Sequence, residues 1–166
     1  MASVAYGIPQ VLQVAGVLGD PWDRILIFAP SLALAPAFVC AVAAARECAP
    51  KERGIWGATA LAFAIIYAVL VSIVYVNQLG VVIPRDISGR SAGFELWACC
   101  SFQRPMTVVD LLGYTYMSAS TLALAPVYKG VRGANALHAA LIANGVLAPA
   151  LLGQLFWPWL IYIGAL

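Results

Sequence analysis

Long runs of apolar residues dominate this chain, and charged residues separate the runs rather than interrupt them. Each run reaches the roughly 20 residues that a helix needs to cross about 30 Å of hydrocarbon. Inside lipid the backbone groups must bond to one another, so each run is predicted to be a helix. The runs lack the regular alternation of a membrane barrel. The predicted transmembrane helices cover residues 24–45, 56–83, 106–128 and 135–157, with a longer outer loop at 84–105.

The two ends of the chain follow this pattern less clearly. The first 22 residues are too mixed to cross a membrane and lack the basic start and cleavage site of a signal peptide. Their apolar side, which includes Ile8, Val11 and Leu18, favours an interfacial helix. The last run, from 135 to 166, exceeds one span and contains two prolines. One tilted, kinked helix is the simpler interpretation; alternatively, residues 155–166 turn back as a short segment or begin a fifth helix.

Composition supports a membrane protein. About 63% of the 166 residues are apolar and 10% are charged, whereas soluble domains carry about a quarter charged residues. The chain is therefore predicted to be a single all-α transmembrane domain, an integral membrane bundle of four helices, at 1–166. A net charge of only +2 without a basic patch argues against nucleic-acid binding.

Orientation is predicted from the lysines and arginines of the loops, which concentrate on the cytoplasmic side. The two short loops carry five of them, and the longer second loop carries three. This places the short loops in the cytoplasm, and the termini and loop 84–105 on the non-cytoplasmic side. The residues counted are Arg46, Lys51 and Arg53, then Lys129 and Arg132, against Arg85, Arg90 and Arg104.

Alanines recur every fourth residue along the first two predicted helices. Small residues at that spacing let helix backbones approach closely in lipid. Both rows are therefore predicted to be packing faces, although alanine is also abundant throughout. The rows are Ala29, Ala33, Ala37, Ala41 and Ala45, and Ala60, Ala64 and Ala68.

Polar residues inside the predicted spans are the candidates for a functional site. Asp110, Tyr114 and Ser118 follow one another at steps of four, so they share a helix face. An ionisable group inside a membrane span is a functional candidate. Alternatively, Asp110 is a first-turn charge that favours the helix dipole. The predicted ligand-binding residues are Asp110, Tyr114, Ser118, Asn77, Gln78, Tyr75 and Gln154.

Other chemistries have little support. His138 lacks metal ligands at recognisable spacing, and we expect it to bond to a loop or a phosphate. Cys99 and Cys100 are adjacent rather than spaced as Cys-x-x-Cys, and neighbouring cysteines rarely bond each other, so no redox motif is predicted. No phosphate-binding loop or nucleophile elbow occurs. The sequence therefore identifies neither a catalytic residue nor a cofactor.

Two functional hypotheses remain. The first is a structural or accessory subunit of a larger membrane complex, which fits a small alanine-rich bundle without a catalytic motif. Its partners would be the lipid bilayer and other membrane subunits or further copies of the chain. The second is a small carrier, channel or intramembrane enzyme with a polar pocket around Asp110.

Overall fold

The protein is built from helices throughout the part of the chain that the structure describes. The computed structural model describes residues 19–99, 101 and 104–160. No strand occurs among these residues, which confirms the all-α prediction. The predicted interfacial helix lies largely in residues 1–18, outside the described part.

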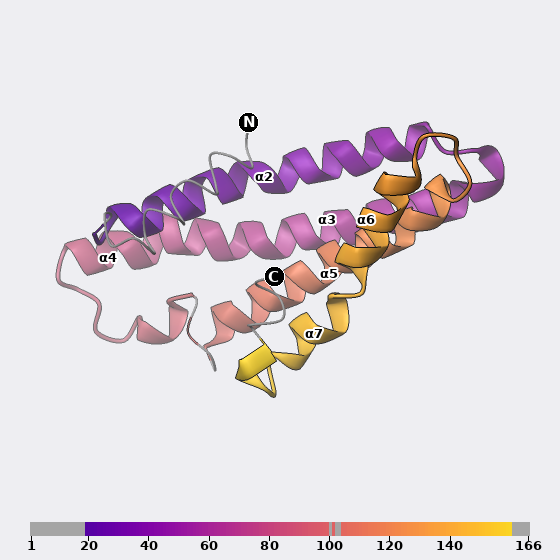
Figure 1. Ribbon diagram of the computed structural model, residues 1–166. Helices are drawn as coiled ribbons and strands as arrows, with labels where there is room; N and C mark the ends of the chain where they lie inside the picture. The colour runs from indigo at the N-terminus through magenta and orange to yellow at the C-terminus, as the bar shows by residue number, and fades with distance from the viewer. Residues whose placement is uncertain (1–18, 100, 102–103, 161–166) are drawn as a thin grey trace.

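Two long helices form the frame of the molecule. α2 (Trp22–Glu47) and α3 (Gly54–Asn77) run side by side in opposite directions, joined through the 3-10 helix η1 (Lys51–Arg53) (Figure 1). α3 continues through a π-helical turn, η2 (Gln78–Val82), into α4 (Ile83–Ile87). The remaining elements are η3 (Glu95–Trp97), α5 (Pro105–Tyr128), α6 (Asn135–Gly145), α7 (Ala148–Gly153) and η4 (Pro158–Leu160).

Three helical stretches are long and apolar enough to cross a membrane, which indicates a membrane-embedded protein. They are Trp22–Glu47, Lys51–Ile87 and Asn135–Gly153. α5 is not among them, although its 24 residues extend over about 36 Å. Its polar residues lower its apolarity. A bundle of four transmembrane helices therefore stays a prediction.

The polar residues of α5 are turned inward. Thr115, Ser118 and Ser120 are all buried. The Thr115 hydroxyl donates to the Leu111 carbonyl of its own helix, at 2.8 Å. Since lipid offers no hydrogen-bond partner, polar side chains in a membrane protein are stable only where protein groups receive them. This arrangement is consistent with a central position for α5, which packs against α3, α6 and α7.

Small residues bring α3 and α5 close together. Ala60 and Ala64 of α3 are fully buried, and the Ser120 hydroxyl of α5 donates to the Ala60 carbonyl at 2.8 Å. Gly113 of α5 lies against Val71, where a Cβ atom would come within 2.8 Å of the valine Cγ1 atom. The alanine row of the second predicted helix thus lies at a close helix contact, as expected for packing in lipid.

The alanine row of α2 behaves differently: Ala45 packs against the core, but the predicted packing role within the chain is wrong for the other four residues. Ala29, Ala33, Ala37 and Ala41 are exposed. The alanine of α2 that packs inside is Ala35, which is fully buried. The four-residue spacing identified a straight row of small side chains but could not show which side of the helix faces α3. We call the four exposed residues the alanine stripe.

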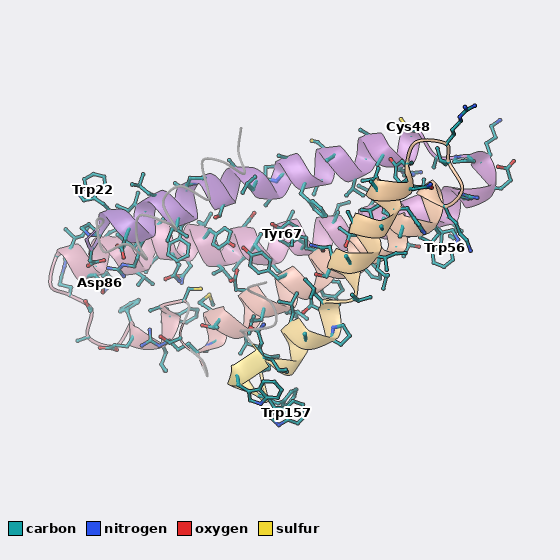
Figure 2. All side chains as sticks on the ribbon, in the orientation of Figure 1. Trp22, Cys48, Trp56, Tyr67, Asp86 and Trp157 are labelled. Carbon is teal, nitrogen blue, oxygen red and sulfur yellow. The ribbon has the colours of Figure 1, made fainter. Side chains whose placement is uncertain are left out.

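One end of the molecule holds the loop 88–104, and we call it the long-loop end. Here Arg24 joins α2 to α4, because its guanidinium donates to the Asp86 carboxylate at 2.7 Å. The same guanidinium pairs with Asp20, and the Ser91 hydroxyl donates to the other Asp86 oxygen at 2.7 Å. Figure 2 shows Trp22 and Asp86 near this end, and Cys48 and Trp56 near the other.

The opposite, short-loop end is closed by side chains that cap α5. The Arg53 guanidinium donates to the carbonyls of Pro126, Val127 and Lys129. The His138 Nδ1 atom donates to the Ala125 carbonyl at 2.8 Å. The last carbonyls of a helix have no partner within that helix, so these two side chains satisfy them.

The last apolar run is broken rather than continuous. α6 ends at Gly145 and α7 begins at Ala148, just before Pro149. After α7 the chain turns, and Leu160 comes back against Gly153. The kink that we predicted is present, since α6 and α7 together form the single apolar stretch Asn135–Gly153. The predicted end at residue 157 is wrong, because α7 ends at Gly153 and the described part of 155–166 turns back. Residues 161–166 lie outside the described part.

Candidate functional site

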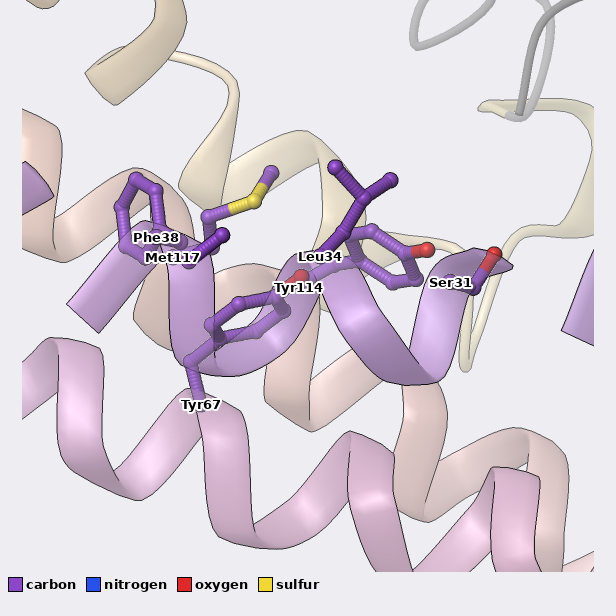
Figure 3. A pocket seen from close by; sticks show the side chains of 7 residues that line it. Ser31, Leu34, Phe38, Tyr67, Tyr114 and Met117 are labelled. Carbon is purple, nitrogen blue, oxygen red and sulfur yellow. The ribbon is translucent and has the colours of Figure 1, made fainter. Parts of the chain in front are cut away.

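A cleft lies between α2 and α5. Both helices pack on α3, but they touch each other at few positions. The resulting space measures about 380 Å³ and is partly open. Figure 3 shows side chains of all three helices around it. The residues that line this α2–α5 cleft are Ser31, Leu34, Ala37, Phe38, Tyr67, Tyr114 and Met117.

Aromatic rings dominate the cleft wall. The Phe38 and Tyr67 rings meet edge to face, with centroids 5.4 Å apart and planes at 84°. The Tyr67 and Tyr114 centroids are 6.0 Å apart at 52°. Edge-to-face and tilted arrangements are the preferred geometries of aromatic pairs. The three rings therefore pack against one another along the cleft wall.

Behind the cleft, two tyrosine hydroxyls lie near a carboxyl group. The Tyr114 and Tyr75 hydroxyls are 2.7 Å apart and hydrogen-bonded to each other. Asp110 lies on α5 one helical turn before Tyr114, on the same face. The Oδ1 atom of Asp110 is buried and has no hydrogen-bond partner within the described part of the protein.

The two amides that we predicted beside Asp110 have another role. Gln78 donates to the Trp97 carbonyl at 2.8 Å and accepts from the Cys99 amide at 3.0 Å. Asn77 donates to the same Trp97 carbonyl at 3.1 Å. These side chains thus fix the loop 88–104 to the end of α3.

Among the seven predicted site residues, the structure brings together Asp110, Tyr75 and Tyr114. Ser118 and Gln154 are buried, with 1% and 4% of their surface exposed, and neither lines the cleft. Sequence reasoning missed most of the cleft wall, because an apolar residue in an apolar helix gives no signal. Tyr67 gave one, since it shares a side of α3 with Tyr75.

A second groove lies between α2 and α3 and is almost wholly apolar. It measures about 760 Å³ and is more open than the α2–α5 cleft. Pro36 lies on its wall, and as an internal proline it leaves the Leu32 carbonyl without a helical N–H donor. The lining of this groove is Leu32, Pro36, Val39, Cys40, Ile65, Ala68, Val69, Ser72 and Ile73.

The described residues offer little support for a metal site or for thiol chemistry. Within the described residues, no group of three or more His, Cys, Asp or Glu side chains is placed to hold a metal ion. Cys40 and Cys48 are free thiols. Cys99 is disulfide-bonded, a pairing that the sequence analysis did not predict.

Comparison with known proteins adds no assignment. No protein-family model, curated protein or solved structure matches this chain.

Proposed function

We propose that this protein is a small carrier that binds an amphiphilic molecule from the bilayer in the α2–α5 cleft. One observation supports the proposal most directly: apolar and aromatic side chains line the cleft together with two tyrosines, and the Tyr114 hydroxyl is hydrogen-bonded to the buried Tyr75 hydroxyl behind it. Ligand sites are typically concave, mostly apolar, and supplied with a few placed polar groups.

The dimensions of the cleft support the same proposal. A volume of about 380 Å³ lies within the range of about 300–1,000 Å³ common for small-molecule sites. Its partial openness gives an apolar tail a way out between α2 and α5. A buried carboxyl oxygen without a partner is costly in an apolar interior, and such a cost is more often tolerated where the group serves a ligand.

The carrier proposal can be tested by filling the cleft with a larger side chain. Ala37 lines it and Ala33 does not, yet both are exposed on α2. Native mass spectrometry of the protein released from nanodiscs detects small molecules that co-purify with it. Ala37→Phe should abolish the binding of these molecules. Ala33→Phe is the matched control and should retain them. Identical bound molecules in the parent and both variants would contradict the carrier role.

A second candidate is the accessory subunit, and the alanine stripe favours it. Exposed small residues on a membrane helix permit close contact with another helix. Ala33→Leu should release a stoichiometric partner from the protein in mild detergent without changing its melting temperature. Ala62→Leu, on an exposed face of α3, is the control. A protein that purifies alone, or that keeps its partner in both variants, would argue against this role.

A further inference from the structure

We propose that the short-loop end binds phospholipids whose headgroups carry a net negative charge. Four exposed cationic side chains support this inference. They come from the last turn of α2, from η1 and from the loop between α5 and α6. The inference does not depend on the carrier proposal; it requires only that the long apolar helices lie in a membrane. We call the four residues the basic surface: Arg46, Lys51, Lys129 and Arg132.

Arg53 brings the two short loops together. Its guanidinium donates to carbonyls at the end of α5, including that of Lys129, and so joins η1 to the start of the α5–α6 loop. The aliphatic stem of Arg46 lies against Gly57 of α3, where a Cβ atom would come within 2.9 Å of the arginine Cγ atom. Figure 1 shows the turn between α2 and α3 beside the α5–α6 loop. The basic surface is therefore assembled from both short loops.

The two ends of the molecule differ in charge. At the long-loop end four arginines are balanced by four carboxylates, and Arg24 is paired with two of them. At the short-loop end five cations face two acids, Glu47 and Glu52, which gives a net charge of +3. Neither acid forms an ion pair among the residues that the structure describes. The balanced charges are Arg24, Arg85, Arg90 and Arg104 with Asp20, Asp23, Asp86 and Glu95.

The α5–α6 loop is the clearest part of this imbalance. Residues 129–134 include Lys129 and Arg132 and contain no acid. Both side chains are exposed, and no ion pair within the described ranges involves either of them. Their charges are therefore left for a partner outside the chain, and that partner must be negatively charged.

The membrane itself supplies a partner of matching charge. Anionic lipids attract lysines and arginines that lie beside a transmembrane helix. Ile55 and Trp56 follow η1 directly and are 71% and 47% exposed, and Figure 2 shows Trp56 near this end. Tryptophan is enriched at the level of lipid headgroups. A phospholipid offers a phosphate to the cations and hydrocarbon to these two side chains, whereas a soluble anion offers only the charge.

The test measures which lipid the protein retains. The full chain is placed in nanodiscs of equimolar phosphatidylglycerol and phosphatidylcholine with identical acyl chains, and native mass spectrometry counts the lipids that stay bound after release. Both leaflets have the same composition, so the orientation of the protein does not affect the result. The parent should retain the anionic lipid about fivefold over phosphatidylcholine. Lys129→Gln combined with Arg132→Gln should lower this preference at least twofold.

Two matched pairs of substitutions control for indirect effects. Arg85→Gln combined with Arg90→Gln removes two exposed cations of the long-loop end and should leave the preference unchanged. Lys129→Arg combined with Arg132→Lys keeps both charges and should retain it. All four residues are exposed, so the melting temperature of each variant in phosphatidylcholine nanodiscs should match that of the parent.

Three results would overturn the inference. The first is equal retention of both lipids by the parent, which would mean that the cations serve membrane insertion alone. The second is a preference that the long-loop pair lowers as much as the short-loop pair does. The third is displacement of the bound lipid by soluble glycerophosphoglycerol, which would show that the surface recognises a free anion. The carrier proposal is tested separately by Ala37→Phe and is unaffected by these outcomes.

Discussion

At the scale of single residues, Asp110 is a group that the fold tolerates rather than requires. Its predicted amide partners, Gln78 and Asn77, bond to the Trp97 carbonyl instead. Tyr75 keeps Tyr114 as a hydrogen-bond partner if the carboxyl is removed. We therefore predict that Asp110→Leu is at least as stable as the parent, because it removes a buried oxygen that has no partner among the described residues.

Thermal unfolding in nanodiscs measures the stability of Asp110→Leu relative to the parent. Ser120→Ala is the comparison, since it removes a buried hydrogen bond to the Ala60 carbonyl at a close helix contact and should lower the free energy of unfolding by about 0.5–1.5 kcal/mol. A loss of similar size in Asp110→Leu would mean that the carboxyl supports the fold.

The residue scale also shows how far sequence patterns reach. The four-residue steps on the third predicted helix correctly placed Asp110 and Tyr114 on one face of α5. No periodicity could predict that Phe38 and Met117, which are 79 positions apart in the sequence, meet at the same cleft. Their side chains are apolar like their neighbours, so only the packing of α2 and α5 on α3 distinguishes them.

At the scale of elements, Gln78 is the residue that connects α3 to the loop 88–104. Its buried amide makes two hydrogen bonds to that loop, whereas the Asn77 amide makes one at an exposed position. Gln78→Leu should lower the free energy of unfolding by about 2 kcal/mol, because it removes two hydrogen bonds at once and leaves the Cys99 backbone amide without this partner, whereas the Trp97 carbonyl keeps only its bond from Asn77.

In Gln78→Leu, the rate of hydrogen exchange at the Cys99 backbone amide should also rise. Asn77→Leu is the matched control and should cost well under half as much. Equal effects of the two variants would show that the loop is held by other contacts.

The contact between α5 and α6 depends on Gly145. A Cβ atom there would lie 2.5 Å from the Leu122 Cβ and 2.9 Å from its Cα, and backbone atoms cannot yield as a flexible side chain can. Gly145→Ala should therefore destabilise the protein by about 1–3 kcal/mol through overpacking. At Gly80 a Cβ would meet nothing within 4 Å, so Gly80→Ala should leave the melting temperature unchanged or raise it. Similar melting temperatures of Gly145→Ala and Gly80→Ala would contradict a close contact between α5 and α6 at Gly145.

Helix positions were easier to predict than helix interruptions. Apolar run length alone located the long helices, since it reflects the membrane itself. The break between α6 and α7 needed more than Pro149, because prolines at 30 and 36 leave α2 a single helix. The same residue type interrupts one helix and not the other, and the difference lies in the neighbouring packing.

At the scale of the whole molecule, orientation is the open structural prediction. The short-loop end is predicted to face the cytoplasm, and Cys48 lies there as an exposed free thiol. An impermeant maleimide should therefore miss Cys48 in intact cells and label it in inverted vesicles. Cys99 is disulfide-bonded, so it should react from outside only after an impermeant reductant.

Cys48→Ser controls for the identity of the labelled site. Labelling of Cys48 in intact cells would reverse the orientation and place loop 84–105 in the cytoplasm.

Both ends of α2 are held to the rest of the protein. Arg24 holds one end to α4 through Asp86, and the turn into η1 holds the other. A helix held at both ends separates from α5 most readily by bending outward at its middle. Pro30 and Pro36 lie in that mid-span, where each removes an internal hydrogen bond and so lowers the bending stiffness. If the proposed carrier role holds, we therefore predict that lateral pressure of the surrounding lipid changes the width of the cleft and that membrane tension changes how fast a bound molecule exchanges.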